Sequence, residues 1–207
     1  MKKIASALVA GFAFSVSGAV WTNGNWSVAA NWMEGVVPEA GAAVTISPVV
    51  SGQTLMVDVD SVSVGSLTFS GAPVVLDGGS VSIAGNLTAN VAVTVNTDIS
   101  LTGSSPILYC SGKVTMNGAL SGKTGSTVTM GTVSGGANGG ANFYGSVTVP
   151  NGTIVFNKPG WKSPPFNFYA PVKVKTIKSD LYNNTTALFL SVGNEWTSLQ
   201  NGYAKGH

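Results

Sequence analysis

Two aspartates, Asp58 and Asp60, have the spacing in this 207-residue chain that best fits acid–base chemistry. Residues two apart on a β-strand point to the same side, so both carboxylates would lie on one face, as in the carboxylate pair of a polysaccharide hydrolase or lyase. Such a site commonly needs a Lys, Arg or His beside the carboxylates, and between Lys3 and Lys113 the chain has none. We therefore expect Asp58 and Asp60 to be solvated acids at a strand end, and an enzyme would require them to meet a distant lysine.

The other reactive residue types are too isolated to form a catalytic or metal site. Cys110 is the only cysteine and His207 the only histidine, so we expect Cys110 to be a small buried hydrophobe and not a catalytic thiol. Asp77-Gly-Gly79 is a single turn and not a repeated calcium-binding nonapeptide. Serine-hydrolase, metalloprotease and phosphate-loop motifs are absent. The sequence predicts no catalytic residue, no metal and no cofactor.

Tryptophan is concentrated near the start of the chain, at Trp21, Trp26 and Trp32. Flat indole faces can stack on pyranose rings, which would make these three residues a sugar-binding platform. The interpretation that we favour is that they cover the open end of a β-fold and bury its core and unpaired strand groups. Either a loop-borne binding site or simple packing would account for a second aromatic group among prolines, namely Trp161, Phe166 and Tyr169.

Charged residues are few and unevenly placed. They make up 9% of the chain, with ten Lys, no Arg and a net charge of +2, so nucleic acid is not an expected partner. After residue 19, six acidic residues precede Lys113, whereas the eight lysines from Lys113 onward accompany only Asp180 and Glu195. Lys173 and Lys175 alternate along a predicted strand. They form either a weak site for anionic polysaccharide or lipid or, as we favour, a solvated edge that discourages sheet aggregation.

Short β-strands are the elements that would position these residues. From Ala43 to Phe156, runs such as 55–59, 66–69, 81–83 and 91–95 alternate Val, Ile and Leu with Ser and Thr, and Gly, Asn and Asp separate them. The outward positions carry small hydroxyl side chains and little charge, which favours a solenoid. We predict an all-β fold, a right-handed parallel β-helix. An antiparallel β-sandwich with hairpin-paired neighbours is the alternative.

The repeats are irregular, and the chain reads as one domain. Four similar segments start at Ser80, Lys113, Thr127 and Ser146. Their uneven spacing indicates turns with loops of different lengths. The composition of the chain alone could also produce the similarity. We expect a β-solenoid with an N-terminal Trp-rich cap over 20–157. An irregular segment rich in proline and aromatic residues follows over 158–207, in the same domain.

Residues 1–19 have the organisation of a secretory signal peptide. Lys2 and Lys3 precede an apolar run over 4–16 and the small residues 17–19, and we expect cleavage after Ala19. An uncleaved anchor would need a longer apolar run. The mature chain has no expected transmembrane segment. We expect an exported bacterial protein, extracellular or at the cell surface, with the periplasm as the alternative.

The first part of the mature chain resembles bacterial secreted β-helical proteins, notably autotransporter passenger regions and autotransporter-associated β-strand repeat proteins. The likeness covers about residues 20–101 and rests on the tryptophans, the Asn31-Trp32 pair, the turn from Gly35 to Pro38, and the Val64-Gly-Ser-Leu67 step. The C-terminal barrel of an autotransporter does not follow. The resemblance implies a non-catalytic surface or extracellular rod, adhesin-like or structural. A carbohydrate-binding module using exposed tryptophans is the alternative, and a polysaccharide-cleaving enzyme is third.

The expected partners are cell-surface polysaccharide or other copies of the chain. The strand pattern continues through Leu188-Phe-Leu190 and the chain stops at His207 without an evident cap. Either the chain is a truncated member of a longer family, or its open end pairs with another copy. The acidic first half and basic second half would favour head-to-tail contact.

Overall fold

The computed structural model is built almost entirely of parallel β-strands. It describes residues 18–132, 139–158, 166–181 and 198–200. Strands make up 57% of the described residues and helix 2%, and the strands stack as a β-solenoid of about seven turns. Within the described part, the helical segment is η1 (Ala29–Asn31), a single 3₁₀ turn. Val81–Ile83 pairs in parallel with Ile99–Leu101, and Val93–Val95 with Val74–Leu76, so the solenoid is confirmed and the antiparallel sandwich is excluded.

Each turn contributes strands to three faces. The first face stacks β1 (Ala19–Trp21), β2 (Ala43–Ile46), β4 (Ser66–Phe69), β6 (Leu87–Ala89), β9 (Ile107–Cys110), β12 (Thr127–Gly131), the second halves of β14 (Val147–Lys158) and β16 (Val172–Leu181), and β17 (Ser198–Gln200). The second face stacks the first halves of β3 (Gln53–Val64) and β5 (Val74–Ile83), then β7 (Val93–Val95), β10 (Val114–Met116), β13 (Ala141–Phe143) and β15 (Phe166–Phe168). The third face stacks the second halves of β3 and β5, then β8 (Asp98–Leu101), β11 (Leu120–Gly122) and the first halves of β14 and β16.

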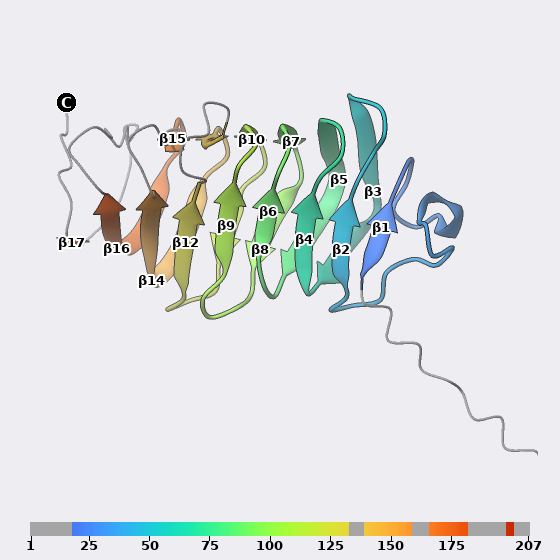
Figure 1. The fold of residues 1–207 in the computed structure, drawn as a ribbon. Helices are drawn as coiled ribbons and strands as arrows, with labels where there is room; N and C mark the ends of the chain where they lie inside the picture. Colours follow the sequence, from blue (N-terminus) through green and yellow to red (C-terminus); the bar gives the residue numbers. More distant parts are fainter. Residues whose placement is uncertain (1–17, 133–138, 159–165, 182–197, 201–207) are drawn as a thin grey trace, which may run out of the picture.

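The coil is right-handed, as predicted. In Figure 1 the chain rises along the first face at the front, crosses over the top to the back and returns below, while the coil advances from the blue end to the red end. The turns differ in length. The stacked partners Val81 and Ile99 are separated by 18 residues, and Leu120 and Val147 by 27. Loops at the bends absorb the difference, which is why the repeat is irregular in the sequence.

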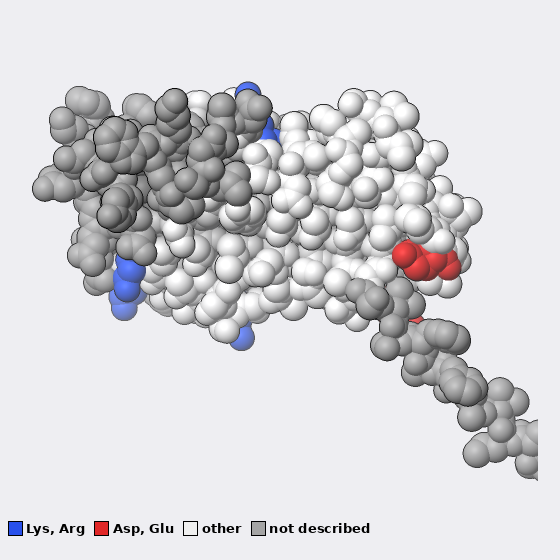
Figure 2. Space-filling view, viewed as in Figure 1, with Lys and Arg blue, Asp and Glu red and all other residues white. Residues whose placement is uncertain are grey.

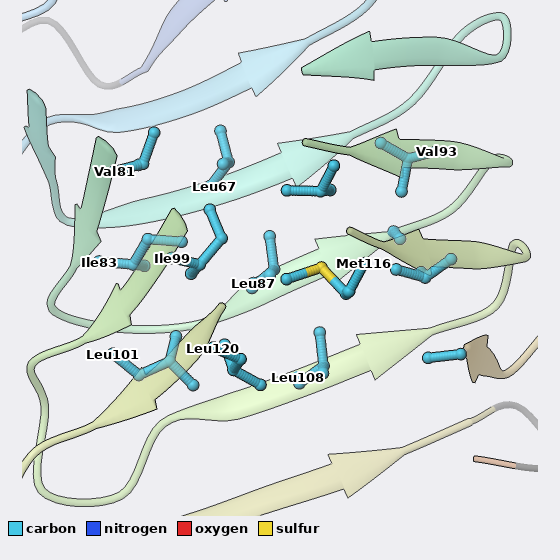
Figure 3. Packing of buried hydrophobic residues seen from close by; sticks show 14 of the residues in the cluster. Leu67, Val81, Ile83, Leu87, Val93, Ile99, Leu101, Leu108, Met116 and Leu120 are labelled. Atoms are coloured by element: carbon cyan, nitrogen blue, oxygen red, sulfur yellow. The ribbon is translucent and has the colours of Figure 1, made fainter. Parts of the chain in front are cut away.

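Alternation along each strand sends every second side chain into one continuous core. Leu67, Leu87 and Leu108 stack on one another from the first face, and Figure 3 shows them meeting Ile99 and Leu120 from the third face. Burial of each such side chain stabilises the fold by about 1.5–3 kcal/mol. Towards the later turns the filling becomes aromatic, with the rings of Phe143 and Phe168 stacked at 4.7 Å between centroids.

Glycines at the bends allow successive turns to approach closely. A Cβ added at Gly145 would overlap the carbonyl oxygen of Gly118, and one added at Gly118 would overlap that of Thr97. The bend between the second and third faces therefore has no room for a side chain at these positions.

Gly145→Ala is expected to lower the free energy of unfolding by about 1–3 kcal/mol, because the backbone of one turn must move away from the next. Gly131→Ala is the matched control, since its added methyl would lie 3.5 Å from the Tyr109 ring and 3.6 Å from the Asn157 carbonyl oxygen, ordinary contacts. Urea unfolding measures both. Equal midpoints for the two variants would contradict the close-approach explanation.

Candidate functional site

The three N-terminal tryptophans are buried and do not form a sugar-stacking platform. Trp21, Trp26 and Trp32 are 0%, 3% and 2% exposed. Trp26 and Trp32 meet edge to face, with 4.9 Å between ring centroids. The Trp32 indole Nε1–H donates to the Trp26 carbonyl oxygen at 2.8 Å. Trp26 and Trp32 belong to the cap that we favoured from the sequence, and Trp21 lies in β1 directly beneath it. Because all three side chains are buried, they are not exposed binding residues.

The N-terminal cap, residues 22–42, covers the first turn by pairing with its free strand groups. The Trp26 N–H donates to the Met56 carbonyl oxygen at 2.8 Å, and Asn25 forms a parallel bridge with Met56 of β3. Trp32 forms an antiparallel bridge with Trp21 of β1. The cap thus replaces a preceding turn, and Figure 1 shows it across the blue end of the stack.

Asp58 and Asp60 are exposed acids, as we expected, and they lie where the regular pairing of the first half of β3 ends. The register of β3 on β5 shifts between Val57 and Ser61, so both aspartates lie on the exposed bend between the second and third faces. The Asp58 carboxylate holds the cap, because it accepts hydrogen bonds from the Ser27 hydroxyl and from the Ser27 N–H, the latter at 2.9 Å. These two hydrogen bonds favour the ionised form and lower the Asp58 pKa.

Cys110 is buried inside the solenoid, as expected. Its side chain is 0% exposed, and burial raises the pKa of the thiol to about 12. A thiol that stays protonated at neutral pH is a poor nucleophile and metal ligand.

The two described members of the predicted second aromatic group differ in exposure. Phe166 is buried, Tyr169 is 56% exposed, and Trp161 lies outside the described residues. Tyr169 instead stacks on Tyr144 of the preceding turn, with 4.7 Å between centroids and 8° between planes. Tyr144 is 52% exposed.

These tyrosines continue a row that sequence reasoning missed. The register of the second face places Asn96, Asn117, Tyr144 and Tyr169 one above another at the same bend. The Asn117 Nδ2 donates to the Asn96 Oδ1 at 2.8 Å. We call these four residues the amide–tyrosine ladder. The repeated tetrads Ala141-Asn-Phe-Tyr144 and Phe166-Asn-Phe-Tyr169 are the signal that could have revealed it.

Other outward positions also form polar rows. Ser63, Ser82, Ser100, Ser121 and Thr148 stack along the third face, and Lys173 continues the same row. Lys173 and Lys175 both point outward, as the alternation predicts. Lys178 lies on the first face, paired with Val155, so the lysines of β16 are spread over two faces.

Charge is separated along the rod. On the face that Figure 2 shows, an acidic patch lies at the N-terminal end, lysines lie towards the other end, and the surface between them carries no charged side chains. No group of three or more potential metal ligands gathers in the described part of the chain. Within the same residues, no helix has the length and apolarity that a membrane span requires.

No protein-family model matches this chain, and neither a curated protein nor a solved structure does. Its function therefore has to be argued from the site itself.

Trp26→Ala is expected to lower the free energy of unfolding by about 3–5 kcal/mol, because it removes a buried aromatic side chain and leaves a cavity at the end of the core. Tyr144→Ala removes a half-exposed aromatic side chain and is the matched control, with a smaller expected loss. Guanidinium unfolding of both variants checks this. A Trp26→Ala midpoint equal to that of the unaltered protein would contradict the cap.

The Asp58 contact predicts a specific pH dependence. Because its folded-state pKa is below the ordinary value of 3.8, its stabilisation is present above that value and is lost as the pH falls through the lowered one. Asp58→Asn should therefore have a lower melting temperature than the unaltered protein at pH 7, and the difference should shrink as the pH falls below about 4. Asp60→Asn, on the same bend, is the control. A difference that persists unchanged at pH 2 would refute this assignment.

Proposed function

We propose that this chain is a non-catalytic exported protein of the bacterial surface or extracellular space, an adhesin-like or structural rod. The observation that supports this proposal most is that a row of hydroxyl side chains runs along the third face and amide pairs lie along the second, whereas the residue types that could react or bind ligands serve the fold. Trp21, Trp26 and Trp32 pack in the core at the N-terminal end, Asp58 binds Ser27 and Cys110 lies in the core. Export is supported by the leader-like residues 1–19.

The state of Asp58 argues against the enzyme. A general acid needs a pKa near the working pH. In a carboxyl group, burial usually raises the pKa towards that value. Asp58 lies on an exposed bend, and its hydrogen bonds to Ser27 move the pKa the other way. Its carboxylate is therefore ionised at neutral pH and already committed to the cap.

A carbohydrate-binding module is the second candidate, favoured by the amide–tyrosine ladder. Tyr144 and Tyr169 are half exposed, and exposed tyrosine combines an apolar ring with a hydroxyl group that can bond to a sugar. The adjacent outward row adds amides, since the Asn167 Nδ2 donates to the Asn142 Oδ1 at 2.8 Å. A neutral glycan lying along the second face would contact both rows.

One experiment separates the three functions. The mature protein is incubated with a panel of bacterial surface polysaccharides, and both bound protein and released sugar ends are measured. Binding without release supports the rod or the module. Loss of at least tenfold in affinity for the double variant Tyr144→Ala and Tyr169→Ala, with binding kept by Asp60→Asn, selects the module. Released ends that disappear in Asp58→Asn and Asp60→Asn would contradict the proposal and favour the enzyme.

A further inference from the structure

Val20 is held by its backbone at the exposed start of the first face. Its N–H donates to the Glu34 Oε2 at 3.0 Å. Its carbonyl oxygen accepts from the Met33 N–H at 2.8 Å, and on its other side it pairs with Thr45 of β2. The cap therefore brings a carboxylate to the nitrogen of this one residue at the outer edge of β1.

We infer that Glu34 is the acceptor for an α-ammonium group that leader cleavage creates at Val20. The inference rests on the proposed export. Water is the co-reactant: hydrolysis of the Ala19–Val20 peptide bond leaves the carboxylate on Ala19 and the amino group, protonated at neutral pH, on Val20. The neutral N–H of the precursor becomes a charged group with three donors beside a carboxylate.

The geometry favours Val20 over Ala19 as the first residue. Ala19 is 2% exposed, so cleavage one bond earlier would place an ammonium group on a buried residue, and removing a charge from water is unfavourable. Loss of Ala19 itself removes one methyl group from the core and the residue of β1 that pairs with Val44, and it leaves the pairing of Val20 and Trp21 with β2 in place. Val20 is half-buried, and its contact with Glu34, where the new charge would lie, is exposed.

The surroundings reinforce this choice. Glu34 and Glu39 belong to the cap, and Asp58 lies on the bend that the cap contacts. Figure 2 shows this end of the rod as acidic and the lysines as lying towards the other end. A positive charge created here is attracted by the local field. Cleavage would thus strengthen the attachment of the cap to β1 after the chain has left the cytoplasm.

The ion pair is tested on two purified forms, one beginning at Val20, released from an N-terminal fusion, and one beginning at Ser17. Glu34→Gln should lower the melting temperature of the Val20 form by about 1–3 °C and that of the Ser17 form by less. The excess should disappear in 1 M salt, which screens exposed charges. Glu39→Gln is the matched control and should affect both forms equally. An equal shift from Glu34→Gln in both forms overturns the inference.

The cleavage site is tested on the full chain expressed with its leader in a bacterial host. N-terminal sequencing of the exported product should begin at Val20. An exported product that begins at another residue overturns this inference alone. A product that stays in the cytoplasm with its leader intact overturns the proposed export, and the inference with it.

Discussion

The structure depends on one constraint, which is that every turn must place its inward side chains directly over those of the turn before. Backbone hydrogen bonds between parallel strands fix the separation of turns at about 4.8 Å, so a residue on one turn has its equivalent as its nearest neighbour on the next. The rows of leucine, isoleucine and valine in the core follow from this spacing, and so do the serine rows, the asparagine pair and the tyrosine pair outside. The bends follow too, because Gly118 and Gly145 leave room for the neighbouring backbone.

A stack of this kind has two ends. The N-terminal end explains why the tryptophans and Asp58, residue types that are common in binding and catalytic sites, have structural roles here. The first turn would expose its core and the outer edge of β3. The cap supplies Trp26 and Trp32 to the core and a backbone partner to Met56. The Asp58 carboxylate then holds the cap at Ser27. Aromatic rings and an ionised acid are typical of binding sites, but here the missing preceding turn accounts for both.

The fold could be predicted from the sequence because alternation is a local property. Runs such as Val81-Ser-Ile83 and Leu67-Thr-Phe69 have the correct inward residues without reference to any other strand. The cap and the burial of Cys110 were also predictable. The bend at Asp58 was not, since a register shift depends on how β3 meets β5. The amide–tyrosine ladder was hidden for the same reason, because Asn117 and Tyr144 are neighbours across a turn of 27 residues whose length nothing local fixes.

The direction of the hydrogen bonds also determines how the molecule responds to mechanical load. Strands run across the rod, so the bonds between turns lie along its length. A force that pulls the two ends apart therefore acts on a few of these bonds at a time, and the solenoid would peel turn by turn from whichever end is gripped, since each turn is held only by its neighbours. A sideways force on one face is instead shared by many turns. Such a rod is suited to resist shear across its faces, and at its N-terminal end the tryptophan-packed cap is the part that opposes the start of peeling.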